Sequence, residues 1–586
     1  MIKLFKNFTK KDLITIGIVI FLVIFSVFLD LRMPEYMSQI TKLVQTEDST
    51  MKEILVAGGH MLICAVGSLI CTISVGYFTS LLAANFSRSV RRKIFAKVEE
   101  FGIAEIKKFS TSSLITRTTN DVTQIETLLA MGLQMMIKSP VMAIWALAKI
   151  LGKSSELSMV TGCGVVVIVL TNIFIIMTVS PRFSKIQKLT DKVNDVTREN
   201  ITGIRVVHAF NAENFEEKRF DNVNDEITGI HLKITKTFAL MDPAMNFVMH
   251  FQHLGIYVVG AYLIINSGMM DKINVFSNMV VFASYGIQVI FSFLMLTMIF
   301  MILPRARVSA KRINEVLDEN TSILDGTFAG STREHGTVEF RDVSFKYPDA
   351  DEYLLRNISF KVNQGETIAF IGSTGSGKST LINLVPRLYD ATDGEVYVDG
   401  VNVKEYKISE LNNKIGYIPQ SAVMFTGTVY DNVSYGDNGR EKPSLEKVKE
   451  AIKVAQGKDF VEKMDKKYKS HIARGGTNVS GGQKQRLSIA RAIARDPEIY
   501  IFDDSFSALD YQTDAKLRTE LKKYTKDATS MIVAQRIGTI MNADKIVVLD
   551  KGECVGVGTH EELLKNCNIY KEIALSQLSE EELHHA

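Results

Sequence analysis

The chain has 586 residues, a formal net charge of only +3 and an apolar fraction of 46%. This length exceeds one ordinary domain, the near-neutral charge gives no indication of nucleic-acid binding, and so apolar a composition excludes a disordered chain. Five cysteines in so long a sequence exclude a small disulfide-rich scaffold. The apolar residues are unevenly distributed, because the long uncharged stretches all lie before about Leu303 and the remainder is typical of a soluble domain.

Six stretches in the first half predict membrane-spanning helices, since a span needs ~20 apolar residues with few charges. They are Leu13–Leu31, Ile54–Phe86, Leu128–Leu151, Leu157–Val179, Phe238–Ile265 and Val275–Leu303. The first stretch could instead be a signal peptide, but no small-residue cleavage site follows promptly and Asp30 lies at its end, which favours an anchor. We expect Lys138, inside the third stretch, to face the bundle interior or an aqueous cavity.

Lysine and arginine placement predicts the orientation of these spans. The amino-terminal segment, the stretch from Arg88 to Lys97, the segment 182–236 and the stretch from Arg305 to Arg312 are all basic. The remaining loops are short and mixed in sign, so we expect both termini to be cytoplasmic. The connections between spans two and three and between spans four and five are long and rich in helix formers, which predicts that the spans continue as helices into the cytoplasm.

A phosphate-binding loop is predicted in the second half. The apolar strand Glu366–Ile371 runs directly into Gly372–Thr380, and a helical segment follows. In this pattern the backbone N–H groups close around phosphate oxygens, Lys378 reaches the terminal phosphates and the Ser379 hydroxyl ligates Mg²⁺. The residues expected to surround the nucleotide here are Gly372, Ser373, Thr374, Gly375, Gly377, Lys378, Ser379 and Thr380.

Two further motifs support a nucleotide site. A second apolar strand, 499–502, ends in Asp503 and Asp504, where a carboxylate beside the phosphate loop supplies a hard oxygen ligand for Mg²⁺ and its waters. Between the two strands, Val479–Arg486 precedes a helical run, and Ser480 is the expected N-cap. A helix start with a hydroxyl, glycine amides and the positive end of the helix dipole is suited to binding an anion.

On these motifs the chain resembles an ATP-binding cassette (ABC) exporter half-transporter over essentially its full length. The resemblance makes 372–380 the Walker A loop, 499–503 the Walker B strand and 480–483 the signature motif. It implies a multi-domain chain: an all-α transmembrane domain of six spanning helices with two long intracellular helical loops, a linker and an α/β P-loop NTPase nucleotide-binding domain. The expected bounds are 1–318, 319–336 and 337–586.

The resemblance also assigns roles to single residues. Tyr347 is expected to stack on adenine, and Gln420 to sense Mg²⁺ and the membrane domain, so that the metal ligands would be Ser379, Gln420 and Asp503. Asp510 lies in the D-loop, which crosses the cassette dimer. Three signature residues would act on the ATP held by the partner's Walker motifs: Ser480, Gly482 and Gln483. Two segments, 113–121 and 202–210, resemble the intracellular loops whose coupling helices touch the cassettes.

Two residues depart from the family pattern. Asp504 stands where the family has Glu, and Gln535 stands where it has His. Aspartate is one methylene shorter, and misplacing a base by ~1 Å can cost on the order of 100-fold in rate. Glutamine donates a hydrogen bond but does not take up a proton as histidine does. Together the substitutions predict a degenerate ATP site that binds nucleotide and hydrolyses it slowly.

Because the signature motif is intact apart from Val479, which replaces the usual Leu, we expect this chain to complete a competent site on a second half-transporter as a heterodimer. The expected activity is ATP-driven export of amphipathic drug- or lipid-like compounds, including multidrug efflux, by alternating access across a bacterial plasma membrane. The alternatives are a homodimeric exporter with Asp504 as the base, and an ATP-gated or regulatory membrane protein that moves no solute.

Overall fold

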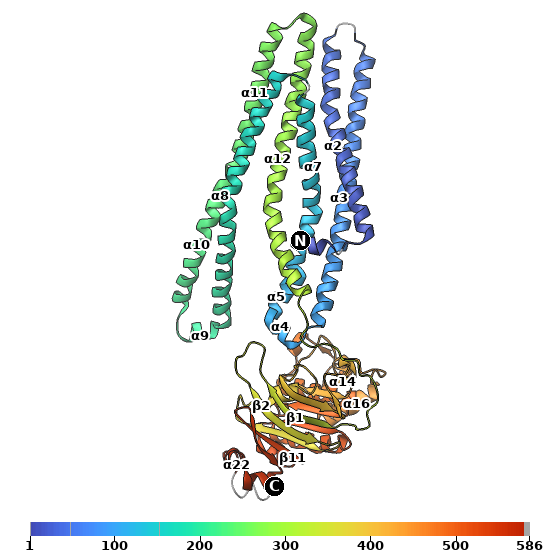
Figure 1. Ribbon diagram of the computed structural model, residues 1–586, viewed down its shortest axis with the longest axis vertical. Coiled ribbons are helices and arrows are strands. Elements are labelled where there is room, and N and C mark those ends of the chain that lie inside the picture. The colour runs from blue at the N-terminus through green and yellow to red at the C-terminus, as the bar shows by residue number, and fades with distance from the viewer. Residues whose placement is uncertain (1, 7, 47–48, 152, 579–586) are drawn as a thin grey trace. The chain divides into compact units, whose positions relative to one another are not determined.

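The computed structural model describes residues 2–6, 8–46, 49–151 and 153–578 (Figure 1). The chain divides into two compact units, which are described separately. The first comprises Met1–Glu99 and Thr111–Glu319, and the second comprises Glu100–Ser110 and Asn320–Ala586.

Long helices make up the first unit. Six helical segments among the described residues are long and apolar enough to cross a membrane, which confirms the number predicted from the sequence. The third segment begins with four short elements, α5 (Thr111–Thr116), η1 (Arg117–Asp121), α6 (Val122–Thr127) and η2 (Leu128–Gly132). The other helices of the unit are α1 (Ile2–Phe5), α2 (Lys10–Gln45), α3 (Met51–Glu99), α7 (Leu133–Leu151), α8 (Ser155–Thr202), α9 (Ile204–Ala209), α10 (Glu213–Ala239), α11 (Met241–Asn266) and α12 (Met269–Leu317).

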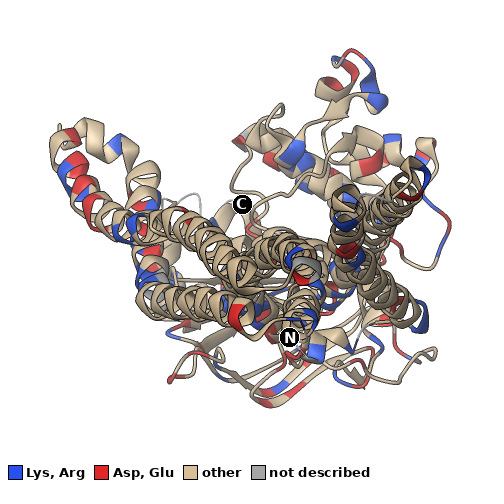
Figure 2. Cartoon of the chain, turned by 90° about the horizontal axis from the view of Figure 1, so that it is seen from above, with Lys and Arg blue, Asp and Glu red and all other residues tan. Residues whose placement is uncertain are grey.

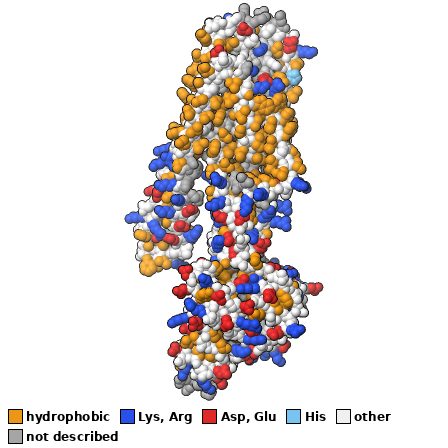
Figure 3. All heavy atoms as spheres, in the orientation of Figure 1, with side chains coloured by type: hydrophobic (Ala, Val, Ile, Leu, Met, Phe, Trp, Pro, Cys, Tyr) orange, Lys and Arg blue, Asp and Glu red, His pale blue; other side chains and the backbone are white. Residues whose placement is uncertain are grey.

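Local sequence explains where α2 begins. It also explains why the surfaces of the long helices are apolar. Thr9 caps α2 through a reciprocal capping box with Asp12. Only 22% to 35% of the residues in the most apolar window of each span are buried within the chain, so large hydrophobic side chains cover the outside. Figure 3 shows them as a band over the helices, and seen from above most turns of the long helices carry no charged residue (Figure 2). Such a surface is suited to hydrocarbon rather than water.

Two charged residues within the spans, Asp30 and Lys138, form an ion pair. Lys138 lies 3.1 Å from the Asp30 carboxylate, and the Ser68 hydroxyl donates to the same carboxylate. The Gln288 amide donates to the backbone carbonyl of Asp30 at 3.3 Å. The side chains of Asp30 and Lys138 are 15% and 32% exposed. Lys138 therefore faces a neighbouring helix, α2, where the Asp30 carboxylate neutralises its charge.

A ten-stranded sheet forms the centre of the second unit, in the order β5-β4-β1-β2-β12-β11-β3-β10-β9-β6. β10 pairs in parallel with β3 on one side and β9 on the other, with Val533 opposite both Phe370 and Asp503. The carboxyl ends of β3 and β9 therefore meet at one edge of the sheet, where α/β proteins bind ligands. The strands are β1 (Val338–Phe345), β2 (Leu355–Val362), β3 (Thr367–Gly372), β4 (Asp393–Val398), β5 (Val401–Asn402), β6 (Ile415–Ile418), β9 (Ile499–Asp503), β10 (Thr529–Val533), β11 (Lys545–Asp550) and β12 (Glu553–Gly558), with a separate pair β7 (Gly427–Thr428) and β8 (His471–Ile472).

The helices of the second unit pack on this sheet and on each other. A segment from far upstream, α4 (Ile103–Phe109), belongs to the same unit, because Ile103 and Ala104 pack against the core that contains β1, β2 and β3. The other helices are α13 (Lys378–Asn383), α14 (Ile408–Asn413), α15 (Val429–Val433), α16 (Leu445–Val454), α17 (Lys458–Glu462), η3 (Lys467–Lys469), η4 (Arg474–Gly476), α18 (Gly481–Arg495), α19 (Tyr511–Tyr524), α20 (Ile537–Ile540), α21 (His560–Asn566) and α22 (Asn568–Leu575).

Candidate nucleotide-binding site

The loop between β3 and α13 has a backbone that requires glycine at two places. A Cβ on Gly372 would lie 1.9 Å from the Leu549 carbonyl oxygen. Gly377 has φ +94°, and a Cβ there would lie 2.5 Å from the Leu355 side chain. The chain turns so tightly between strand and helix that neither position has room for a side chain. Three residues at the tip are exposed: Ser373, Thr374 and Gly375. This is the arrangement predicted for a phosphate-binding loop.

Lys378 crosses back over this loop. Its ammonium donates to the backbone carbonyls of Gly372 at 2.9 Å and Ser373 at 2.8 Å. Burial lowers the pKa of Lys378, while the carboxylates of Asp504 and Asp503 act in the opposite direction. The cation is thus held at the mouth of the loop by backbone oxygens, which an incoming phosphate would replace with stronger charge-assisted bonds.

The predicted magnesium ligands lie together. The Ser379 hydroxyl donates to the Asp503 carboxylate at 2.6 Å, although the two residues are 124 positions apart. Burial raises the pKa of Asp503, and the Ser379 hydrogen bond partly offsets this rise. A hydroxyl and a carboxylate that meet beside a phosphate loop form an oxygen donor set that fits Mg²⁺. The amide N–H of Gln420, the third predicted ligand, donates to the neighbouring Asp504 at 3.3 Å, and ligation of Mg²⁺ through its amide oxygen stays a prediction.

Asp504 is the centre of a small hydrogen-bonded cluster. Its Oδ2 accepts from the Gln535 amide at 2.7 Å and from the Gln420 amide at 3.3 Å. The residue is only 7% exposed and has φ +46°, a left-handed conformation that aspartate tolerates better than most residues. Its backbone N–H donates to the carbonyl of Val533 on β10. The two residues that depart from the family pattern are therefore in direct contact.

Tyr347 connects an aromatic cluster to the phosphate loop. Its hydroxyl forms a 2.9 Å hydrogen bond with the Thr380 hydroxyl at the start of α13. Its ring contacts Phe345 and Tyr389 edge to face, with centroids 5.0 and 5.4 Å apart. The ring is half-buried, and its expected stacking on adenine stays a prediction.

The signature segment forms the predicted capped helix. The Ser480 hydroxyl accepts from the Gln483 backbone N–H at 3.3 Å, and the Gln483 side chain accepts from the Ser480 N–H at 2.9 Å. Gly482 lies in the same turn, close to the Ala508 carbonyl. Asp510 caps α19 in a similar way, accepting from the Thr513 N–H at 3.0 Å. Among the described residues, no hydrogen bond joins the signature residues to the Walker residues.

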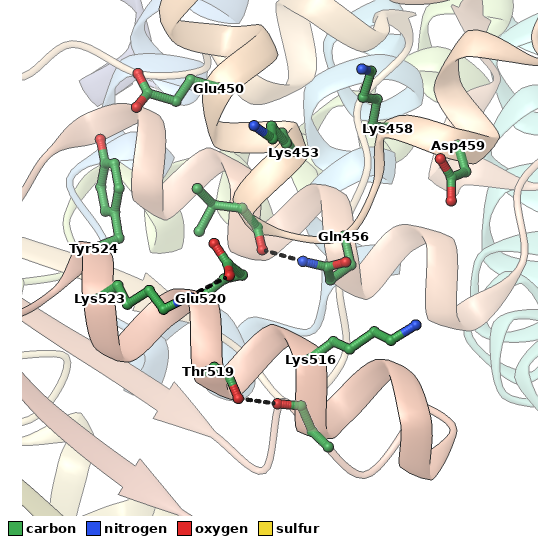
Figure 4. Close-up of a pocket in the computed structure, with 12 residues that line it drawn as sticks. Glu450, Lys453, Gln456, Lys458, Asp459, Lys516, Thr519, Glu520, Lys523 and Tyr524 are labelled. Atoms are coloured by element: carbon green, nitrogen blue, oxygen red, sulfur yellow. Dashed lines mark hydrogen bonds and ion pairs between the residues drawn. The ribbon is translucent and has the colours of Figure 1, made fainter.

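Sequence reasoning missed two features of this unit. The first is a cleft of about 870 Å³ between α16, α17 and α19 (Figure 4), in which lysines and carboxylates alternate. The second is a carboxylate cluster: the Lys414 ammonium lies 2.7 Å from the buried Asp399 and 3.0 Å from Glu498, and His335 lies near Glu498. No motif marks either place, because the residues that converge there come from distant segments. In the second cluster lysine supplies the cation that a metal would otherwise supply.

Comparisons with known proteins agree with this architecture. The ABC transporter transmembrane region family matches residues 16–293, and the ABC transporter family matches residues 355–507. An uncharacterized ABC transporter ATP-binding protein of Mycobacterium bovis is 38% identical over 511 residues, 87% of each chain. The uncharacterized ABC transporter ATP-binding protein YfiB of Bacillus subtilis is 34% identical over 98% of each chain.

Two further matches extend the comparison. The ATP-dependent lipid A-core flippase of Aliivibrio fischeri is 30% identical over 503 residues, 85% of this chain and 84% of the flippase. Among solved structures, a bacterial Atm1-family ABC exporter with ATP bound has the same fold, with a TM-score of 0.81, 22% identity, and coverage of 97% of this chain and 100% of that one.

The six apolar helices followed by a P-loop sheet domain define a membrane transporter with an attached ATPase. The chain belongs to the ABC transporter family and has the exporter fold, with one transmembrane domain and one nucleotide-binding domain. ATP binding follows from this membership.

Proposed function

We propose that this chain is one subunit of a heterodimeric exporter, that it moves amphipathic drug- or lipid-like compounds by alternating access, and that its own Walker motifs form a degenerate ATP site. The observation that carries the proposal is the hydrogen bond from the Gln535 amide to the Asp504 carboxylate. Both termini would be cytoplasmic in a bacterial plasma membrane, as the basic loops indicate.

The geometry around Asp504 favours binding over hydrolysis. Two amide donors converge on one carboxylate oxygen, Oδ2, and occupy the lone pairs that an attacking water would need at that atom. Neither glutamine takes up a proton, so no neighbouring side chain replaces the family's histidine as a proton relay or charge switch. The phosphate loop itself has all its expected parts. Mg²⁺, held by Ser379 and Asp503, would neutralise charge on the phosphates.

The need for a second chain rests on the signature helix and on α9. Ser480 and its neighbours present a capped helix start that has no hydrogen bond to a Walker residue in the described part of the chain. The tip that includes α9 exposes apolar side chains, with Val206 61%, Phe210 77% and Phe215 69% exposed. Such a surface is suited to a partner's cassette. A partner with Glu and His at the positions of Asp504 and Gln535 would use this signature helix for rapid hydrolysis.

The substrate class rests on the lining of the spans and on the relatives. The first half has long apolar spans with few fixed charges, and Lys138 is already neutralised by Asp30. The lipid A-core flippases among the relatives act on a lipid, which supports a lipid-like or amphipathic substrate for this chain.

The test is the Mg²⁺-ATPase activity and oligomeric mass of this chain purified alone in lipid nanodiscs, and again after co-expression with a second half-transporter. We expect negligible turnover alone and turnover restored in a complex of two different chains. Robust turnover by a homodimer would contradict the heterodimer and support Asp504 as a working base. Turnover without substrate-stimulated flux would support a gated or regulatory protein instead.

A further inference from the structure

A lysine of the upstream helix α4 lies over the aromatic cluster beside the phosphate loop. The Lys107 ammonium is 4.8 Å from the centre of the Tyr347 ring and 5.8 Å from the centre of the Tyr389 ring. These are cation–π distances. Helix α4, labelled in Figure 1, belongs to the second unit, as do both rings, and in the sequence it follows the membrane span α3.

The position of α4 on this unit is fixed by more than Lys107. Ile103 and Ala104 pack on the core of the sheet. Glu105 is buried and accepts from the backbone N–H of Gly102 at 2.9 Å and of Ser322 at 3.1 Å. With the helix held in this way, the long side chain of Lys107 is the part of α4 that can leave the ring without moving the backbone.

The Lys107 ammonium reaches the half-buried Tyr347 ring from an exposed position on α4. Phe345 and Tyr389, which also contact this ring, are 2% and 6% exposed, whereas Lys107 is exposed. Lys107 therefore approaches from solvent and the other two approach from the core. Hydrogen bonding with Tyr389, opposed by partial burial, raises the pKa of Lys107, so the side chain is a full cation at neutral pH.

We propose that Lys107 occupies the open face of Tyr347 when the cassette is free of nucleotide, and that the adenine base of ATP displaces it. One face of the Tyr347 ring contacts only one partner, and stacking of a base on that face has a more favourable free energy than a cation over an exposed ring. The adenine of ATP therefore displaces the Lys107 ammonium, and ATP binding releases the Lys107 side chain of α4. Phosphates bound without a base leave the contact in place. This inference rests on the proposed role of Tyr347 in stacking adenine.

The first test compares the affinity of ATP with that of inorganic tripolyphosphate, using the full chain in nanodiscs. We expect Lys107→Ala to bind ATP about 2- to 5-fold more tightly, because the competing cation is gone, and to bind tripolyphosphate unchanged. Lys107→Arg keeps the cation and should resemble the unmodified chain. Lys108→Ala is the matched control, since it removes the same charge from the same helix and Lys108 lies over Phe109 instead. Weaker or unchanged ATP binding by Lys107→Ala would overturn the proposal.

The second test needs no variant. The rate of Lys107 acetylation by a small amine-reactive reagent, measured by mass spectrometry, should rise when ATP is added and stay constant with tripolyphosphate. An ATP-independent rate would overturn the displacement.

Tyr347→Ala separates the two proposals. If it leaves ATP affinity unchanged, the stacking role of Tyr347 is wrong. If it weakens ATP but Lys107→Ala has no effect on either ligand, only the role of Lys107 is wrong.

Discussion

Two regions of the second unit face nucleotide in this family's architecture, and they differ in how their polar groups are satisfied. In the Walker cluster, Lys378 bonds to its own loop and Asp504 accepts from two amides. At the signature helix, Ser480 and Gln483 satisfy each other in a regular capping box and leave the helix start accessible. Under the proposed function, this difference would separate binding from hydrolysis within one chain, because both substituted residues meet at Asp504 and the phosphate loop keeps its expected residues.

The largest expected effect on ATP turnover comes from substituting a residue in each region, in the complex with the second chain. Ser480→Ala should lower steady-state ATP turnover by at least about 100-fold, because it removes the capped helix start from the competent site. Asp504→Asn is the matched variant in the Walker cluster and should change turnover by less than about 3-fold. ATPase assays of the two purified complexes measure both. Equal losses would contradict the asymmetry.

A second variant tests whether the Walker cluster still binds ATP. Lys378→Ala removes the cation at the mouth of the phosphate loop and should weaken ATP binding to the chain alone by about 30-fold, equivalent to roughly 2 kcal/mol of charge-assisted hydrogen bonding. Equilibrium binding of a fluorescent ATP analogue measures the change. Unaltered affinity would mean that the loop does not hold the phosphates. Lys346→Ala, an exposed lysine outside the loop, is a control for the loss of one positive charge.

The buried Asp399 contrasts with Asp503 of the Walker cluster, because the cation beside Asp399 is the Lys414 ammonium and not a ligand. Lys414→Met should lower the melting temperature of the full chain by roughly 5 °C or more, since it leaves the buried Asp399 carboxylate without its cation. Thermal unfolding in nanodiscs measures it. EDTA should leave this melting temperature unchanged. A marked fall with EDTA would show a metal at Asp399 and contradict the assignment of Lys414 as the cation.

The pH dependence of that cluster has a definite sign. Burial disfavours the charge on Lys414, but hydrogen bonds with Asp399 and Glu498 outweigh it and raise the pKa of Lys414 above its ordinary value of 10.5. A raised lysine pKa gives stability that is fully present below that value and is lost as the pH rises through the folded-state pKa. The melting-temperature difference between the unmodified chain and Lys414→Met should therefore be constant from pH 7 to pH 9 and shrink only at more alkaline pH. A difference that already shrinks between pH 7 and pH 9 would contradict this.

The sequence was sufficient for the parts of the fold that depend on local pattern. Long uncharged stretches predicted the six spans, and strand-to-glycine-loop spacing placed Gly372 and Lys378 correctly beside Asp503. The N-cap at Ser480 was also predicted, although its reciprocal bond with Gln483 was seen only in the structure. These features depend on periodicity and short-range geometry, which a single sequence contains.

Contacts between distant segments could not be predicted in this way. The pairing of Lys138 with Asp30, the cation at Asp399 and the lysine over Tyr347 each join residues whose separation is set by the tertiary fold. The direct bond between Gln535 and Asp504 is of the same kind, although the two substitutions were recognised separately. Neither propensity nor spacing specifies which side chains of separate elements meet.

The most direct test of the degenerate site is a single-turnover measurement on the chain alone, with radiolabelled ATP bound in the presence of Mg²⁺. The measurement is made on the homodimer, in which the chain's own signature helix is available. The unmodified chain should retain intact ATP. The double variant Asp504→Glu with Gln535→His should convert ATP to ADP at least about 10-fold faster. Equal rates of conversion in the two proteins would contradict the claim that Asp504 and Gln535 make this site slow.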